Sequence, residues 1–203
     1  DPVEATRKAI DLMRMAVGRA RWLKALETGR LAVTHSALVV GGGLAGLTAA
    51  QSLADQGFDV DLVEKEAVLG GNLRLLHTTL EGADVQAQLA RMVAGVEASP
   101  RIRVHLQSEV VEVAGHVGSF RSRIRTPRET VAIAHGVIVM ATGGVERPTD
   151  QYLRGRHPRV VTQRELEAHL AAAGGSEAAK RNGGDPAVVA SLGDAPTVVM
   201  IQC

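Results

Sequence analysis

A glycine-rich turn between an apolar strand and a helix constrains this chain more than any other feature. The string VVGGGLAGL places Gly41, Gly43 and Gly46 in the GxGxxG pattern of dinucleotide-binding turns. Glycine-rich turns are common, so the context matters. An apolar strand precedes the turn, a helix follows, and Glu64 closes the next strand, 59–63, at the spacing that the pattern requires. We therefore predict one right-handed strand–helix–strand crossover.

Each residue of this turn has a physical role toward a bound pyrophosphate. Gly41 permits the tight turn, Gly43 leaves no Cβ to obstruct the phosphates, and Gly46 lets the helix pack against the strand. The N–H groups that open the helix, at Leu44 and Ala45, point at the anion, and the helix dipole strengthens the attraction.

Glu64 is placed to accept hydrogen bonds from an adenosine ribose. A carboxylate there repels a 2′-phosphate, so the site suits FAD or NAD rather than NADP. Gly70–Gly71–Asn72 lets the chain run past a diphosphate, and strand 137–140 delivers the turn Ala141–Thr142–Gly143–Gly144 back to the cofactor. With an antiparallel meander over 109–134, these features favour FAD. The plain alternatives are a tight turn with a surface glutamate and ordinary loops.

The composition excludes several other classes of protein. With 45% hydrophobic and 22% charged residues, the chain has the composition of a soluble globular protein. With a net charge of +1 and 2% aromatic residues, the chain lacks the basic surface and the stacking rings that nucleic-acid binding uses. The single cysteine, Cys203, precludes a disulfide framework or a cysteine-ligated cluster within this chain. No apolar run approaches the roughly 20 residues of a membrane span. We expect a cytoplasmic location.

We expect three segments in an α/β chain. Residues 1–33 are a helical lead-in, and 34–150 are a Rossmann-like FAD-binding domain with a parallel sheet and a small antiparallel meander. Residues 151–203 are a helix, a mobile loop and the first strand of a second dinucleotide-binding-like domain, as in two-dinucleotide-domain flavoproteins, here truncated. The lead-in reads as a basic amphipathic helix over 4–28. It suits packing on its own or a preceding domain, with binding to a membrane surface as the alternative.

The remaining pattern predicts the other elements and their buried residues. In the helix over 44–56, the expected inner face is Leu47, Ala50, Leu53 and Ala54. In a helix over 84–97 it is Leu89, Met92, Val93 and Val96. The expected later elements are a strand over 102–106, meander strands over 109–113, 120–125 and 130–134, a buried apolar strand over 137–140, a helix from the N-cap Thr162 through about 172 with Glu165 completing a capping box, a loop over 174–196 and a strand over 197–202.

Few other residues point to chemistry, and no catalytic residue is readable. The seven histidines do not cluster at metal spacing, so we expect them in turns or on the surface and predict no metal site. Arg74 and His77 follow the Gly-Gly turn and are placed to face a flavin. Cys203 fits a small buried hydrophobic residue better than a redox thiol.

Several stretches together resemble a known family. The stretches are 39–66, 69–72, 117–120, 141–144, 160–162 and 199–203, together with the lead-in helix over 5–26. They resemble the flavin-containing A subunits of heterodisulfide reductases. The first stretch is shared with many flavoproteins, whereas Val117–Phe120 and the final Ile201–Cys203 are more specific in combination.

The resemblance implies a thioredoxin-reductase-like flavoprotein that binds FAD. Such a protein passes electrons between a two-electron donor and the iron–sulfur subunits of a heterodisulfide-reductase-like complex. It would be oligomeric at full length. By position, Lys65 and Val110 would lie near the adenosine, Val110 through its backbone. The turn residues Gly71, Asn72, Thr142 and Gly143 would approach the diphosphate or the isoalloxazine.

The chain also departs from the family. Archaeal members carry cluster-ligating cysteines after the Gly-Gly turn, and residues 72–91 contain none. Iron–sulfur clusters are therefore expected only in flanking regions or partner subunits. In this fold a returning segment completes the FAD site, so we expect residues 1–203 alone to bind FAD weakly or not at all and to be inactive. Two alternatives stay open. One is an FAD- or NAD(P)-dependent disulfide oxidoreductase or amine-oxidase-like flavoenzyme; the other is a non-catalytic Rossmann docking module.

Overall fold

A computed structural model describes residues 1–25, 29, 31–176, 180, 182–192 and 198–201. The chain divides into two compact units, 1–32 and 33–203. The first contains α1 (Pro2–Arg21), which begins at the N-cap Asp1 and has no buried residue. This helix ends sooner than the predicted 4–28, since residues 23–25 are not helical, and 26–28 lie outside the described residues. No helix of the described residues is both long enough and apolar enough to cross a membrane.

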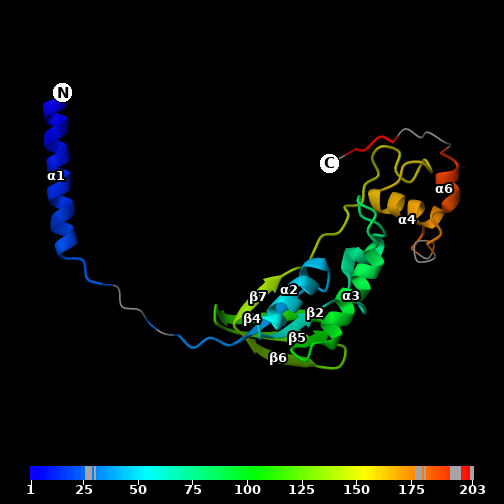
Figure 1. Cartoon of the computed structure of the whole chain (residues 1–203), viewed down its shortest axis with the longest axis horizontal. Coiled ribbons are helices and arrows are strands. Elements are labelled where there is room, and N and C mark those ends of the chain that lie inside the picture. Colours follow the sequence, from blue (N-terminus) through cyan, green and yellow to red (C-terminus); the bar gives the residue numbers. More distant parts are fainter. Residues whose placement is uncertain (26–28, 30, 177–179, 181, 193–197, 202–203) are drawn as a thin grey trace. The chain divides into compact units, whose positions relative to one another are not determined.

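The second unit is organised around a four-stranded parallel sheet. Its strands are β1 (Ser36–Val40), β2 (Asp59–Val63), β3 (Ile102–His105) and β7 (Val137–Met140), in the order β3-β2-β1-β7. Strand β1 lies in the middle, where Val39 pairs with Leu62 of β2 and with Val139 of β7. The crossover helices α2 (Leu44–Asp55) and α3 (Val85–Ala98) cover one face (Figure 1). The predicted Rossmann-like fold is confirmed.

The core between helices and sheet forms because alternate strand residues face α2 and α3. Val39 and Leu62 are fully buried against Leu47 of α2 and Val96 of α3. Each such side chain contributes about 1.5–3 kcal/mol by leaving water. Of the predicted inner face of α2, Leu47, Ala50 and Ala54 are buried, and Leu53 is half-buried at the margin of this core. In α3, Met92 and Val93 are only half-buried at the margin of this core.

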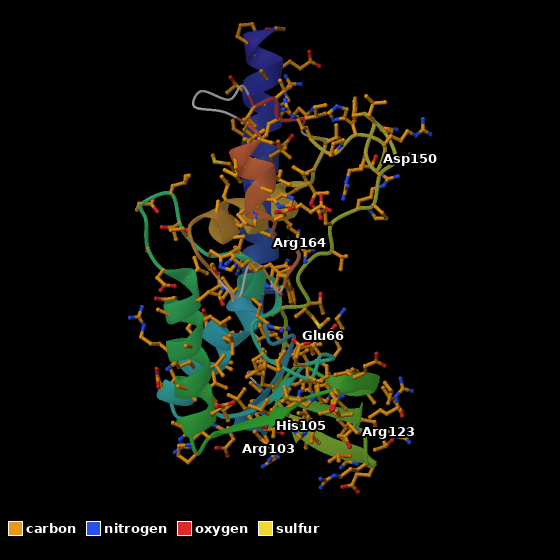
Figure 2. The ribbon with its side chains drawn as sticks, turned by 90° about the vertical axis from the view of Figure 1, so that its right-hand side faces the viewer. Glu66, Arg103, His105, Arg123, Asp150 and Arg164 are labelled. Atoms are coloured by element: carbon orange, nitrogen blue, oxygen red, sulfur yellow. The ribbon has the colours of Figure 1, made fainter. Side chains whose placement is uncertain are left out.

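The predicted meander covers the opposite face of the sheet. Strands β4 (Glu109–His116), β5 (Ser119–Arg125) and β6 (Thr130–His135) are antiparallel in the order β4-β5-β6. Ile124 and Ile133 of the meander pack against Leu38 and Val63 of the parallel sheet. On the outward face, the exposed Arg123 of β5 pairs with Glu112 of β4 at 3.0 Å (Figure 2). The result is three layers, with helices, parallel sheet and meander in that order.

Strand β7 confirms the predicted parallel pairing but is not fully buried. Met140 is 69% exposed and Val137 is 42% exposed. The reason is topological: in the described part of the chain β7 is the last strand of the sheet, and only β1 flanks it.

Residues beyond the sheet confirm one prediction and correct two. Helix α4 (Gln163–Ala173) has the predicted capping box of Thr162 and Glu165. The stretch 174–196, predicted as a loop, contains the short helix α6 (Pro186–Ala190), which begins at an Asp185 cap followed by proline. The strand predicted over 197–202 is absent at residues 198–201, which pair with no described strand. Residue 197 and the last two residues, Cys203 among them, lie outside the described residues.

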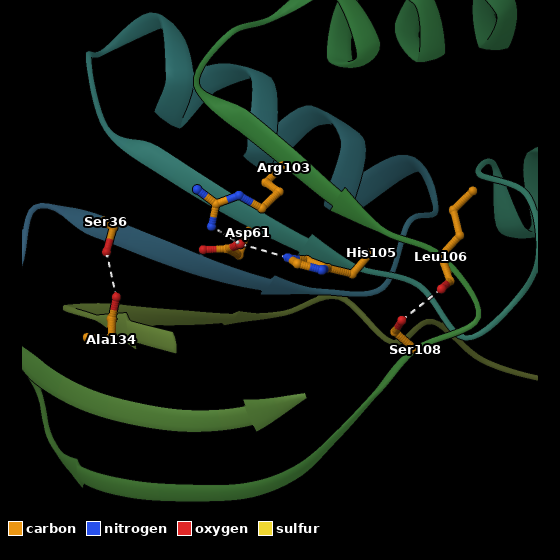
Figure 3. Close-up of polar contacts among 7 residues, drawn as sticks. All are labelled: Ser36, Asp61, Arg103, His105, Leu106, Ser108 and Ala134. Atoms are coloured by element: carbon orange, nitrogen blue, oxygen red, sulfur yellow. Dashed lines mark hydrogen bonds and ion pairs between the residues drawn. The ribbon is translucent and has the colours of Figure 1, made fainter. Parts of the chain in front are cut away.

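Two polar groups are buried on the meander side of the sheet. Asp61 of β2 accepts hydrogen bonds from Arg103 Nη1 at 3.1 Å and from His105 Nε2 at 2.7 Å, both on β3 (Figure 3). Its side chain is only 12% exposed, so these partners offset the cost of burying the carboxylate.

The prediction that the histidines lie in turns or on the surface is wrong for His105, whose side chain on β3 is 12% exposed, and for His135, which is fully buried at the end of β6. Its Nδ1 lies 3.1 Å from the Val137 carbonyl oxygen and its Nε2 lies 2.8 Å from Ser122 Oγ. Because a carbonyl only accepts, Nδ1–H is the donor, and Nε2 accepts from the serine hydroxyl. Burial lowers the pKa of His135 from 6.5, which outweighs the opposite effects of the Val137 carbonyl and the Asp61 charge.

We predict that His135 makes the stability of the second unit depend on pH. As the pH falls below 6.5, this histidine binds a proton in the unfolded chain, whereas in the folded chain it does so only at a lower pH. The free energy of unfolding should therefore fall toward acid, by at most about 1.4 kcal/mol per pH unit. In His135→Gln this part of the slope should be lost, as measured by urea denaturation between about pH 5 and pH 8. The exposed His116→Gln is the control and should keep it; an unchanged slope in His135→Gln would contradict the assignment.

Candidate functional site

The thirteen residues predicted to bind a cofactor gather at the carboxyl edge of the parallel sheet. The glycine turn follows β1, Glu64 and Lys65 follow β2, Val110 lies near the start of β4, and the 141–143 turn follows β7. Gly71 and Asn72 lie in the short helix η1 (Gly71–Leu75). The strand order reverses at β1, with β2 on one side and β7 on the other. Such a switch point is where open α/β sheets bind ligands.

Close backbone contacts make two glycines of the turn obligatory. A Cβ on Gly46 would lie 1.7 Å from the Gly41 carbonyl oxygen, so only glycine lets the first turn of α2 approach β1 this closely. Gly41 has a φ of +108° and lies against the Ala141 backbone, where its own Cβ would stand 2.2 Å from the carbonyl oxygen. The turn after β1 and the turn after β7 are therefore in backbone contact.

The N-terminus of α2 is left open by its N-cap residue. Gly43 is the N-cap and has no side chain to accept from the first-turn N–H groups. The other described α-helices have an N-cap side chain, from an aspartate or threonine, in that role. The first-turn N–H groups of a helix have no intrahelical partner, and here the exposed Leu44 and Ala45 begin the helix. This end of α2 suits an anion such as a pyrophosphate.

Glu64 is buried and points at the glycine turn. Its Oε2 accepts from the Gly42 N–H at 2.6 Å, and its Oε1 accepts from the Glu66 N–H at 2.8 Å. Two backbone donors thus hold the carboxylate in one orientation, and charge-assisted bonds of this kind are about twice as strong as neutral ones. The carboxylate links the end of β2 to the end of β1.

A cavity of about 480 Å³ opens beside Glu64, between the parallel sheet and β4. One part of its wall is apolar, and the other carries the carboxylate, a lysine and backbone of the strand ends. The lining residues are Leu38, Val40, Gly41, Val63, Glu64, Lys65, Ser108, Glu109, Val110, Val113, Ile138, Met140 and Thr142. Five of the predicted residues line it, namely Gly41, Glu64, Lys65, Val110 and Thr142. An aromatic base with a ribose fits this combination of apolar wall and carboxylate.

The other predicted residues lie around the opening of α2. The Gly70 N–H donates to the Gly42 carbonyl at 2.7 Å, which lays the start of η1 on the glycine turn. A Cβ on Gly71 would stand 3.2 Å from the Cα of Gly43. Asn72 Nδ2 donates to the Gly144 carbonyl at 3.2 Å, which ties the same loop to the turn after β7. The three loops predicted to meet are brought together.

Arg74 lies in η1 and His77 just after it, and that these two residues face a flavin stays a prediction. Arg74 lines a second cavity, between η1 and α3, together with Leu89 and Asn182. The backbone N–H of His77 donates to Glu167 Oε1 of α4 at 2.8 Å, and the buried Nε2 of its ring has no partner among the described residues. Neither residue lines the cavity beside Glu64.

Sequence reasoning missed the segment that shapes the far wall of the cavity. Gln107 has a φ of +50°, and its N–H donates to the Glu66 carbonyl. The buried Ser108 donates its N–H to the Glu64 carbonyl at 2.9 Å and its hydroxyl to the Leu106 carbonyl at 2.7 Å. A left-handed glutamine leaves no mark in the sequence, so no signal could have found this segment. Among the described residues, no group of three or more His, Cys, Asp or Glu side chains could hold a metal ion.

Comparison with known proteins agrees with this geometry. The NAD(P)-binding Rossmann-like domain family matches residues 39–103. The iron–sulfur A subunit of a CoB–CoM heterodisulfide reductase from Methanopyrus kandleri is 48% identical over 130 residues, which are 63% of this chain and 20% of that protein. The A subunit of the ferredoxin:CoB–CoM heterodisulfide reductase from Methanosarcina mazei is 39% identical over 130 residues, 63% of this chain and 16% of that protein.

The resemblance to the A subunits of heterodisulfide reductases is confirmed. The chain spans about one fifth of the length of these relatives or less, so the activity and partners of the whole protein are matters for proposal. Among solved structures, the L-proline dehydrogenase of P. horikoshii superposes with a TM-score of 0.51 at 22% identity, over 63% of this chain and 26% of that one. That likeness concerns the fold.

We predict that Gly46→Ala destabilises the second unit, whereas Gly43→Ala leaves it folded. Alanine at position 46 gains about 1 kcal/mol in helix propensity, but its Cβ meets a backbone oxygen that cannot move aside, so we expect a net loss of at least about 2 kcal/mol. At position 43 nothing lies within 4 Å of an added Cβ, and we expect a change below about 1 kcal/mol. Urea denaturation of both variants measures the difference. Equal stabilities would show that the helix does not need this close approach.

Proposed function

We propose that this chain supplies the FAD-binding part of a flavin-dependent oxidoreductase of the heterodisulfide reductase type. The observation that carries the proposal is the buried Glu64 carboxylate, held by the Gly42 and Glu66 N–H groups at the mouth of the cavity. Within the chain, residues 34–150 would form the FAD-binding domain. Residues 1–33 would be its lead-in, and 151–203 would lead into a second dinucleotide-binding-like domain.

The residues present fit the adenosine diphosphate half of FAD. Glu64 would accept from the ribose hydroxyls, since a carboxylate with two fixed backbone donors keeps lone pairs for further acceptance. Lys65 and Val110 line the cavity that the adenine would occupy. The open N-terminus of α2, at Gly43, Leu44 and Ala45, would bind the pyrophosphate.

Two further loops support FAD over a single nicotinamide dinucleotide. Gly71 and Asn72 lie beside the glycine turn, and Asn72 bonds to the turn that follows β7. Through Gly71, Asn72, Thr142 and Gly143, this chain would hold the diphosphate and the flavin side of the cofactor. The meander closes the adenosine cavity from the face opposite the helices.

The flavin, when bound, supplies the redox chemistry, because it accepts two electrons and releases them singly or in pairs. This chain binds and orients it. The single cysteine cannot build a cluster, so iron–sulfur clusters would belong to flanking regions or partner subunits of an oligomeric complex. The Methanopyrus relative is named as an iron–sulfur protein, which supports that arrangement. We also propose a cytoplasmic location for the protein.

We predict that Glu64→Gln weakens FAD binding in the full-length protein. The amide keeps the shape but loses the charge that strengthens hydrogen bonds to the ribose, so the Kd should rise about 10- to 100-fold. Titration followed by flavin fluorescence measures the change. Glu129→Gln is the control: Glu129 is an exposed carboxylate in the turn between β5 and β6, outside the cavity lining, and its side chain should not matter. A full-length protein that carries no flavin and binds none would contradict the proposed function.

A further inference from the structure

We propose that Gln86 of α3 is a positioning residue that holds η1 against the glycine turn and thereby sets the affinity for the pyrophosphate and flavin side of FAD. The inference rests on the proposed function and extends it to a residue outside the ligand cavity. It concerns one side chain and two carbonyl groups at the end of a short helix.

Gln86 bonds to two backbone carbonyl groups at once, and we call this pair of hydrogen bonds the clamp. Its Nε2 donates to the Leu73 carbonyl at 2.9 Å and to the Leu76 carbonyl. The Leu73 carbonyl also accepts from the N–H of Leu76, the residue that caps η1, at 3.2 Å, so the Gln86 amide uses its second lone pair. The Leu76 carbonyl lies just past the helix, and the same NH₂ group supplies its donor. Gln86 lies just after the N-cap Asp84, so α3 fixes the position of its backbone.

The other end of η1 contacts the site. Gly70 donates to Gly42, Gly71 lies against Gly43, and Asn72 donates to Gly144. Gly70 and Gly71 have positive φ angles, and glycine, which has no Cβ, restrains its own backbone less than other residues do. At the far end of η1, Gln86 bonds to the Leu73 and Leu76 carbonyls, and Asn182 Nδ2 donates to the Arg74 carbonyl at 3.5 Å. Gln86 therefore helps to hold Gly71 and Asn72 beside the open end of α2.

Gln86 is remote from the adenosine cavity. It lines the separate cavity between η1 and α3, with Leu69 and Arg74, and is absent from the lining beside Glu64. A positioning role therefore predicts a split: ligands that reach past the glycine turn should lose affinity, while ligands confined to the adenosine cavity should not. A purely structural role would weaken both, or neither.

The test compares three variants of the full-length protein with two ligands, FAD and AMP. Gln86→Glu is isosteric but replaces the donor by a carboxylate that faces two carbonyl oxygens. Gln86→Lys keeps donors at similar reach. Gln88→Glu is the matched control on the same exposed turn of α3, where Gln88 only accepts from Arg91 Nη2. Kd values come from flavin fluorescence for FAD and from calorimetry for AMP, and unfolding is followed in parallel.

We expect Gln86→Glu to raise the Kd for FAD by about tenfold or more and to leave the Kd for AMP unchanged. Gln86→Lys and Gln88→Glu should bind both ligands as the wild type does. If Gln86→Glu does not fold, the lysine variant decides, because loss of FAD affinity in Gln86→Lys would overturn the clamp. Unchanged FAD affinity in Gln86→Glu, or a parallel loss of AMP affinity, would overturn it too. A wild type that binds AMP but not FAD would instead refute the proposed function.

Discussion

The approach of the first turn of α2 to the carbonyl of Gly41 is the contact on which the rest of the site depends. Because Gly46 has no Cβ, the helix lies close enough to β1 for its open end to face the carboxyl edge of the sheet. The same turn presents the Gly42 N–H to Glu64 and lets Gly41 touch the backbone that follows β7. The absence of a side chain at Gly46 thus brings the N-terminus of α2, a carboxylate and a neighbouring loop together around a single opening.

Most of this arrangement could be predicted because its signals are local. Apolar strands of the right length, glycines at fixed spacing and a Thr162 cap with Glu165 three positions on each encode a conformation within a few residues. The position of Glu64 also follows from local rules, since the end of β2 must lie beside the end of β1 in a parallel crossover. For the same reason the three predicted loops lie together at the carboxyl edge of the sheet, as expected.

The features that could not be predicted are those created by neighbours distant in sequence. Asp61 reads as a surface residue of an alternating strand until Arg103 and His105 from β3 surround it. His135 is buried with its two ring nitrogens paired to the Ser122 hydroxyl of the adjacent strand and to the Val137 carbonyl. Exposure of β7 depends on its place in the strand order, and the role of Gln86 depends on a short helix that no periodicity marks. In each case the deciding partner comes from another element.

The pairing of Val39 with Val139 has a consequence for how the molecule assembles. Closing a chain loop of about a hundred residues costs entropy before any contact repays it, so β7 should join the sheet after the local crossover and the meander have formed. The contact between the two turns would then form late in folding. A dinucleotide that touches both turns would leave the early steps of folding untouched and mainly slow the reverse reaction. For such a protein a bound cofactor would lower the rate of unfolding and would leave the rate of folding nearly unchanged.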